Sequence, residues 1–165
     1  MRVTLSDAAR QYIALFEDVT GATARDCVIF DADADDGGAG DTDDGDGASD
    51  VDGDEERDRV VFLVKPGDMG QAIGSGGENV RRVEDRLDKD VTLVEDADTA
   101  EDFVANALAP AAVYNVTVSE DDETIAYAEV DSEDTGIAIG ENGRNITTAE
   151  KLAKRHYDVD DIQLT

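Results

Sequence analysis

One skeleton, Gly-x-Ala-Ile-Gly-x-x-Gly-x-Asn, occurs twice in this sequence, as GQAIGSGGENV at residues 70–80 and as GIAIGENGRNI at residues 136–146. The two copies lie at a constant offset of 66 residues. Self-similarity at one offset indicates an internal repeat. The sequence therefore predicts two tandem units, each with a glycine-rich loop of the form Gly-x-x-Gly.

The residues around each loop predict the same order of elements, α-β-β-α-α-β, in both units. In the first unit, Ser6 precedes an apolar helical pattern that stops at Gly21, and strands are expected at 26–32, 59–65 and 90–95. In the second, Thr99 is a candidate helix cap, and a hairpin is expected at 113–130. We expect an α+β fold with units at 1–97 and 98–165, held in one arrangement because almost no linker joins them.

The composition is strongly acidic. The 165 residues include 42 acidic and 14 basic ones, for a net charge of -28, and only four of the basic residues are lysines. In molar salt the Debye length falls to about 3 Å, which screens the self-repulsion of such a surface. Dispersed carboxylates with little lysine favour a protein from an extreme halophile. The alternative is an acidic partner-binding protein from a mesophile.

Several classes of function are disfavoured by the sequence. The single cysteine, Cys27, lies in a strand-like run and is expected to be a buried apolar residue, and His156 is also alone. We therefore expect no enzyme, no cofactor and no metal site. The N-terminus has no apolar core of a secretion signal, and no apolar run is long enough to cross a bilayer. The sequence predicts a cytoplasmic protein.

An acidic insert at 31–58 separates two predicted strands and holds 14 acidic residues and one arginine. Its aspartates resemble those of a calcium loop, but such a loop needs a glycine at the sixth position and a glutamate at the twelfth. Counting from Asp31 places Asp36 and Thr42 there. Because the insert has almost nothing apolar to bury, we expect a disordered acidic loop and not a calcium site.

Three interpretations compete for the repeated glycine loop. The first is a plain turn between helices, in which glycine only supplies a positive φ. The second is a nucleotide site, which needs a strand leading into the loop or a following Gly-Lys-Ser/Thr, and neither is present. The third is a KH module, whose Gly-x-x-Gly loop joins two helices and clamps the backbone of about four nucleotides. The repetition within matched frames favours the third.

The two units resemble type II KH domains, and the pair resembles the archaeal NusA-like transcription termination factors. The likeness is carried by KPGDMGQAIGSGGENVRRVE at 65–84 and DTGIAIGENGRNITTAEKLAKRH at 134–156. It implies a protein that binds single-stranded nascent RNA and acts with RNA polymerase. It also implies backbone contacts at the two loops and apolar grooves for the bases. The loop residues are Gly74, Ser75, Gly76 and Gly77, with Gly140, Glu141, Asn142 and Gly143, and the groove residues are Ile73, Val80, Ile139 and Ile146.

The sequence departs from that family in having no lysine or arginine inside either loop, and in lacking the bacterial relatives' polymerase-binding and barrel domains. The first departure is compatible with RNA binding, because backbone amides and apolar burial keep their strength in molar salt. The second leaves the mode of polymerase contact open.

Positive charge is concentrated just after the loops. Residues 78–89 and 144–155 hold 8 of the 14 basic residues. An alternative cause is the preference of helix C-termini for cations. The predicted flanking contacts are Asn79, Arg81, Arg82, Arg144 and Asn145.

We expect a non-enzymatic RNA-binding factor of transcription termination or elongation. Two alternatives stay open at this point. One is a KH protein of ribosome assembly or RNA processing. The other is an acidic protein-interaction module that has lost RNA binding.

Overall fold

The structure, a computed structural model, describes residues 5–30 and 58–165. The first unit comprises α1 (Asp7–Thr20), β1 (Ala24–Phe30), β2 (Arg59–Val64), α2 (Met69–Ile73), η1 (Ser75–Gly77), α3 (Glu78–Leu87) and β3 (Asp90–Glu95). The second comprises α4 (Ala100–Ala107), β4 (Val113–Glu120), β5 (Thr124–Val130), α5 (Thr135–Ile139), η2 (Glu141–Gly143), α6 (Arg144–Tyr157) and β6 (Asp161–Leu164). The α+β fold and the repeated element order are confirmed. The predicted boundary after residue 97 falls in the connection between β3 and α4.

The ends of the first helix of each unit follow from local side-chain chemistry. Ser6 Oγ accepts a hydrogen bond from the amide of Ala9, and Thr99 Oγ1 accepts one from the amide of Asp102. Each bond satisfies an amide that has no partner inside its helix. Gly21 ends α1 in the left-handed conformation, at φ 74°. The predicted caps at Ser6 and Thr99 are confirmed.

Each unit contains a three-stranded sheet with one antiparallel and one parallel pair. In the first sheet, β1 and β2 are antiparallel with Cys27 opposite Phe62, and β2 and β3 are parallel with Val61 opposite Thr92. In the second, the strand order is β4-β5-β6, with the same two kinds of pairing. A parallel pair needs a long crossover connection, which α2 and α3 supply in the first unit and α5 and α6 in the second.

Strand β2 is buried along its whole length because both faces of the first sheet are covered. Val60, Phe62 and Val64 pack into the core of the first unit, where Phe16 of α1 stacks on Phe62 at 4.5 Å between ring centroids. Val61 and Leu63 point the other way and join the core of the second unit. The two units therefore share one hydrophobic core across their junction.

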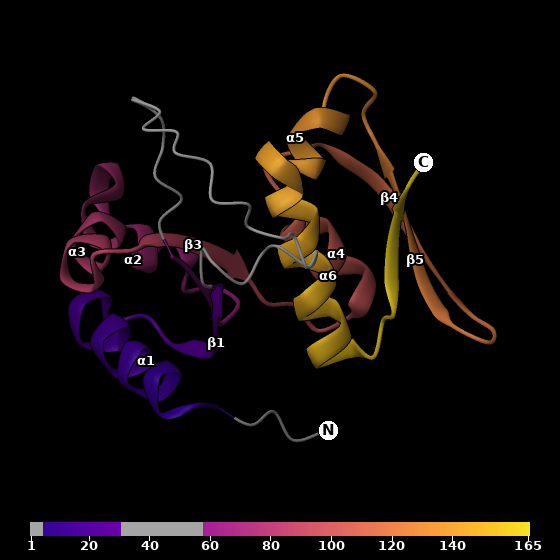
Figure 1. The fold of residues 1–165 in the computed structure, drawn as a ribbon. Helices are drawn as coiled ribbons and strands as arrows, with labels where there is room; N and C mark the ends of the chain where they lie inside the picture. Colours follow the sequence, from indigo (N-terminus) through magenta and orange to yellow (C-terminus); the bar gives the residue numbers. More distant parts are fainter. Residues whose placement is uncertain (1–4, 31–57) are drawn as a thin grey trace, which may run out of the picture.

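This shared core arranges the molecule in four layers (Figure 1). Helices α1 and α3 cover one face of the first sheet, and α4 and α6 lie between the first sheet and the second. Helix α6 begins at the second glycine loop. The packing of α6 against the first unit therefore sets where the second loop lies relative to the first.

Polar contacts along α6 reinforce this packing. The carboxylate of Asp26, fully buried on β1, accepts hydrogen bonds from Arg155 Nε at 2.6 Å and Arg155 Nη2 at 3.1 Å, and His156 Nε2 lies 2.7 Å from it. At the start of α6, Arg59 Nη1 donates to Thr148 Oγ1 at 2.6 Å and to the carbonyl oxygen of Arg144 at 3.2 Å. Helix α6 is thus tied to the first unit near both of its ends.

Cys27 is buried and only 3% exposed, as predicted. Of the predicted acidic insert, Asp58 is described and its carboxylate pairs with Lys89 at 2.9 Å. Residues 31–57, on which the calcium and disorder predictions rest, lie outside the described residues. In the described ranges, every helix is too short or too polar to cross a membrane.

Candidate nucleic-acid interface

The two glycine loops have nearly the same backbone conformation. Gly74 and Gly140 have φ 75° and 79°, and Gly77 and Gly143 have φ 80° and 73°. Each loop is closed by one hydrogen bond, from Gly77 N to Gly74 O at 3.2 Å and from Gly143 N to Gly140 O at 3.1 Å. Both loops leave a short helix and enter a longer one without a leading strand, as a KH loop does and a nucleotide-binding loop does not.

The two variable positions of each loop tolerate different residues. Gly76 has φ 62°, and Asn142 holds the equivalent place with φ 57°. Asparagine is one of the few residues other than glycine that adopt this conformation readily. Ser75, Gly76, Glu141 and Asn142 are all exposed. The outer edge of both loops is therefore accessible to a ligand.

The first glycine of each loop is required by close packing as well as by its positive φ. A Cβ atom on Gly74 would lie 3.0 Å from the amide nitrogen of Asn79, and one on Gly140 would lie 2.8 Å from that of Asn145. The two asparagines hold the helices around the loop together. Asn79 Nδ2 donates to Gln71 O at 2.8 Å, and Asn145 Nδ2 lies 3.3 Å from both Ile137 O and Leu108 O. Both side chains already form hydrogen bonds within the protein. Their contacts with RNA stay a prediction.

An apolar side chain stands exposed in front of each loop. Ile73 and Ile139, the last residues of α2 and α5, are each 40% exposed, and Val80 and Ile146 behind the loops are half-buried. Exposed isoleucines at equivalent places in both units are surfaces available to bases. The groove role of these four residues stays a prediction.

A hollow of about 240 Å³ lies between α2 and β3 of the first unit and reaches the second unit. Met69 and Leu93 line it from the first unit, and Asn106, Ala109 and Asn145 line it from the second. Asn145 directly follows Arg144 at the second loop. The hollow therefore adjoins the first residues of α6.

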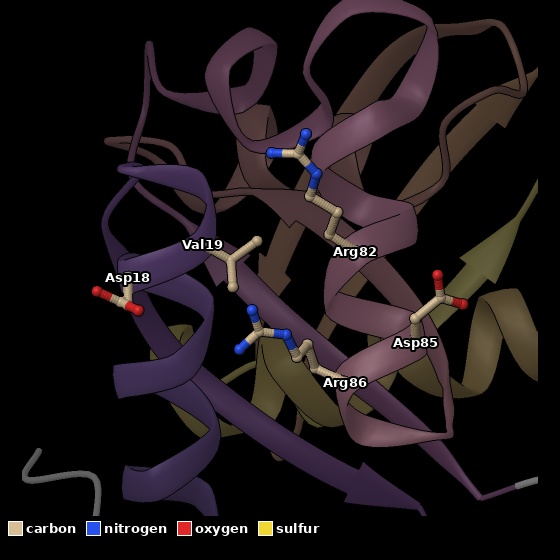
Figure 2. A pocket seen from close by; sticks show the side chains of 5 residues that line it. All are labelled: Asp18, Val19, Arg82, Asp85 and Arg86. Atoms are coloured by element: carbon tan, nitrogen blue, oxygen red, sulfur yellow. The ribbon is translucent and has the colours of Figure 1, made fainter.

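The basic residues of α3 differ in their surroundings. Arg81 folds back onto the first loop and donates to the carbonyl oxygens of Gly76 and Gly77. Arg82 pairs with Glu78 one turn earlier. Figure 2 shows Arg82 and Arg86 on the side of α3 that faces α1, where they line a cavity of about 490 Å³. Arg82 thus points along the α1 side of the helix, and its predicted contact with RNA stays a prediction.

Sequence reasoning missed the lining of the inter-unit hollow. Met69, Leu93 and Asn106 belong to three elements that only tertiary packing brings together. The one signal in the sequence was the short join between β3 and α4, which places the end of α4 near the first sheet. Within the part of the chain that the structure describes, no cluster of three potential metal ligands occurs.

Comparisons with known proteins agree with this geometry. A family model described as the NusA-like second KH domain matches residues 100–165, and a KH domain model matches residues 42–121. The "Probable transcription termination protein NusA" of Halococcus morrhuae is 55% identical over 99% of both chains. The protein of the same name in Halobacterium salinarum is 54% identical over the full length of both chains.

The likeness extends to a more distant relative and to a solved structure. A further "Probable transcription termination protein NusA", from Methanococcus vannielii, is 30% identical over 99% of this chain and 80% of that protein. The crystal structure of APE1850 superposes with a TM-score of 0.73 at 25% identity, covering 98% of this chain and 100% of that one. Nearly the whole chain is thus similar to the named NusA proteins and, separately, to this solved structure.

Proposed function

Because this chain belongs to the NusA family, we propose that it is a non-enzymatic transcription termination factor that binds single-stranded RNA at both glycine loops. The relatives' names supply the process, and the KH domain models supply the class of ligand. Relatives in Halococcus and Halobacterium agree with the acidic, lysine-poor composition and with work in high salt.

The observation that carries the proposal is the duplicated loop. Two turns 66 residues apart share their torsion angles, their closing hydrogen bond and an exposed isoleucine on the preceding residue. A plain helix-helix turn has no need of exposed apolar side chains at both copies. A KH loop does, because the phosphate backbone lies over the glycines while bases enter the groove beside them.

The hollow between α2 and β3 suggests a path from one loop to the other. An RNA chain that leaves the first groove would contact Met69 and Leu93 and then the surface that carries Asn106 and Asn145. At about four nucleotides for each KH site, the two loops together would hold about eight. Because α6 is tied to the first unit, the two sites would act at a constant separation.

Fluorescence titration with single-stranded RNA in about 2 M KCl, where screening is nearly complete, tests RNA binding. Changing Ser75-Gly76 and Glu141-Asn142 to Asp-Asp should abolish binding, because carboxylates repel phosphate at short range. Changing the same pairs in both loops to Asn-Asn is the matched control, since asparagine has nearly the volume of aspartate without its charge. Unchanged affinity in the Asp-Asp variant would favour the protein-interaction alternative.

RNA polymerase is the protein partner that we propose, since the relatives are named for transcription termination. Affinity capture of the tagged protein from native lysate at high salt, followed by mass spectrometry, should recover polymerase subunits. Recovery of ribosomal subunits in their place would favour the alternative in ribosome assembly.

A further inference from the structure

Arg81 brings a positive charge to the first glycine loop, although the loop contains no basic residue. Its side chain starts one turn into α3 and folds back toward the loop. Nη2 lies 2.6 Å from the carbonyl oxygen of Gly76, and Nε lies 3.3 Å from that of Gly77. The two hydrogen bonds hold the guanidinium group beside the loop without placing a side chain inside it.

Among the described residues, no carboxylate forms an ion pair with Arg81. Its neighbour Arg82 pairs with Glu78, and Arg155 pairs with Asp26. A guanidinium group has five N–H donors, of which Arg81 uses two on the loop carbonyls. Three donors stay available on an exposed residue, and adjacent guanidinium donors match two oxygens of a phosphate.

The second loop has no basic residue at the position equivalent to Arg81. At the offset of 66 residues, Thr147 stands where the first unit has Arg81, and exposed Glu141 adds a negative charge. Residues 74–82 contain Glu78, Arg81 and Arg82, for a net charge of +1. The equivalent residues 140–148 contain Glu141 and Arg144, for a net charge of zero. Loops with the same backbone thus differ in charge.

We propose that Arg81 contacts an RNA phosphate at the first loop, so that the two loops hold RNA by different chemistry. The first uses an ionic contact from Arg81 in addition to its backbone donors, and the second has Thr147 at the equivalent position and so lacks this contact. This inference rests on the proposed RNA binding and adds an unequal role for the two loops. It also explains how a loop without lysine keeps a charge for phosphate.

The salt dependence of RNA affinity separates this role from a merely structural one. For single strands, the slope of log K against log salt changes by about 0.7 for each phosphate neutralised. Arg81→Gln should therefore flatten the slope by about 0.7. Between about 0.5 and 3 M KCl, its affinity deficit relative to wild type should shrink about 3.5-fold. Arg81→Lys, which keeps the charge, should keep the wild-type slope.

Two further variants serve as control and transplant. Arg86→Gln removes one positive charge from the last turn of the same helix and should leave the slope unchanged. Thr147→Arg places a guanidinium group one turn after Gly143, as Arg81 is placed after Gly77, and should steepen the slope by about 0.7. The transplant keeps the test decisive if Arg81→Gln should fail to fold, which circular dichroism would detect.

The outcomes distinguish this inference from the function on which it rests. A wild-type protein that binds no single-stranded RNA at any salt concentration would overturn the proposed function. RNA binding with an equal loss in Arg81→Gln at every KCl concentration would overturn only the role of Arg81, because a constant factor indicates an effect on loop shape. An equal change of slope in Arg86→Gln would overturn it also, since the effect would then be one of overall charge.

Discussion

Replacing Asp26 by asparagine should destabilise the folded protein, because Asp26 joins the two units from a fully buried position. Its carboxylate accepts two hydrogen bonds from Arg155 and one from the backbone N–H of Cys27 at 2.8 Å, and it lies 2.7 Å from His156 Nε2. Burial by itself would raise the pKa of Asp26. The hydrogen bonds from His156 and Arg155, the charge of Arg155 and the Cys27 amide outweigh burial and lower the pKa from 3.8 to about 2.

The size of the effect follows from this pKa. A decrease from 3.8 to about 2, at about 1.4 kcal/mol for each unit, corresponds to about 2 kcal/mol of stability at neutral pH. Removing one partner of a fully buried pair costs about 3–5 kcal/mol. The Arg155 and His156 side chains are 29% and 17% exposed, so water can partly solvate them in the variant. We therefore expect Asp26→Asn to lower the free energy of unfolding by about 2–3 kcal/mol, which is closer to the value from the pKa than to the cost of a fully buried pair.

The sign of the pH dependence is set by the depressed pKa. A carboxyl group with a lower pKa in the folded state stabilises the fold above its unfolded pKa of about 3.8, and this contribution is lost as the pH falls toward 2. The difference in unfolding free energy between wild type and Asp26→Asn should therefore be constant from pH 7 to about 5. It should narrow by about 1 kcal/mol at pH 3.

Urea unfolding in about 2 M KCl, followed by circular dichroism at several pH values, measures this difference. Asp122→Asn, at an exposed position in the β4–β5 hairpin, is the matched control and should change stability little at any pH. A difference below about 0.5 kcal/mol for Asp26→Asn at pH 7, or one that is the same at pH 7 and pH 3, would refute this account of the junction.

Three further outcomes are expected. Gly74→Ala should lower the midpoint of thermal unfolding, because its Cβ would lie 3.0 Å from a backbone nitrogen. Gly76→Asn should leave this midpoint nearly unchanged, since Asn142 has the same conformation in the second loop. Burial and the nearby charge of Asp26 raise the pKa of Cys27 to about 12. Alkylation of Cys27 by iodoacetamide at pH 8 should therefore be at least about 100-fold slower in the folded protein than in urea. Equal rates would contradict the burial of Cys27. Tyr157→Phe removes hydroxyl hydrogen bonds to the Asp96 carboxylate and the Ala97 carbonyl and should cost about 1–2 kcal/mol in urea unfolding; no loss would show that these bonds contribute nothing.

The element order and the loops could be predicted from the sequence because their signals are local or periodic. The offset of 66 residues identified both loops, and Ser6 and Thr99 marked helix starts that the structure confirms. The strand at 59–65 was predicted from its apolar run, but a run alone does not say what covers each face. That Val61 and Leu63 pack into the second unit depends on tertiary contacts.

Only part of the candidate site could be predicted from the sequence, because the rest depends on rotamers and on tertiary contacts. The positions of the loops follow from glycine spacing, whereas the return of Arg81 to the loop carbonyls depends on its rotamer. The pair of Asp26 and Arg155 joins residues 129 positions apart, and no spacing rule connects them. The hollow lined by Met69, Leu93 and Asn106 likewise exists only once the units are docked.

The two sheets differ on one face, which is covered by the other unit in the first sheet and not in the second. At the offset of 66 residues, Val61 and Leu63 of β2 correspond to Tyr127 and Glu129 of β5. Ala126 and Ala128 point inward, so Tyr127 and Glu129 face away from the core, and Glu129 is exposed. This outer surface therefore offers no apolar face against which another pair of helices could pack. Stacking of one copy of the protein onto the next, which could otherwise propagate into filaments, is thereby discouraged.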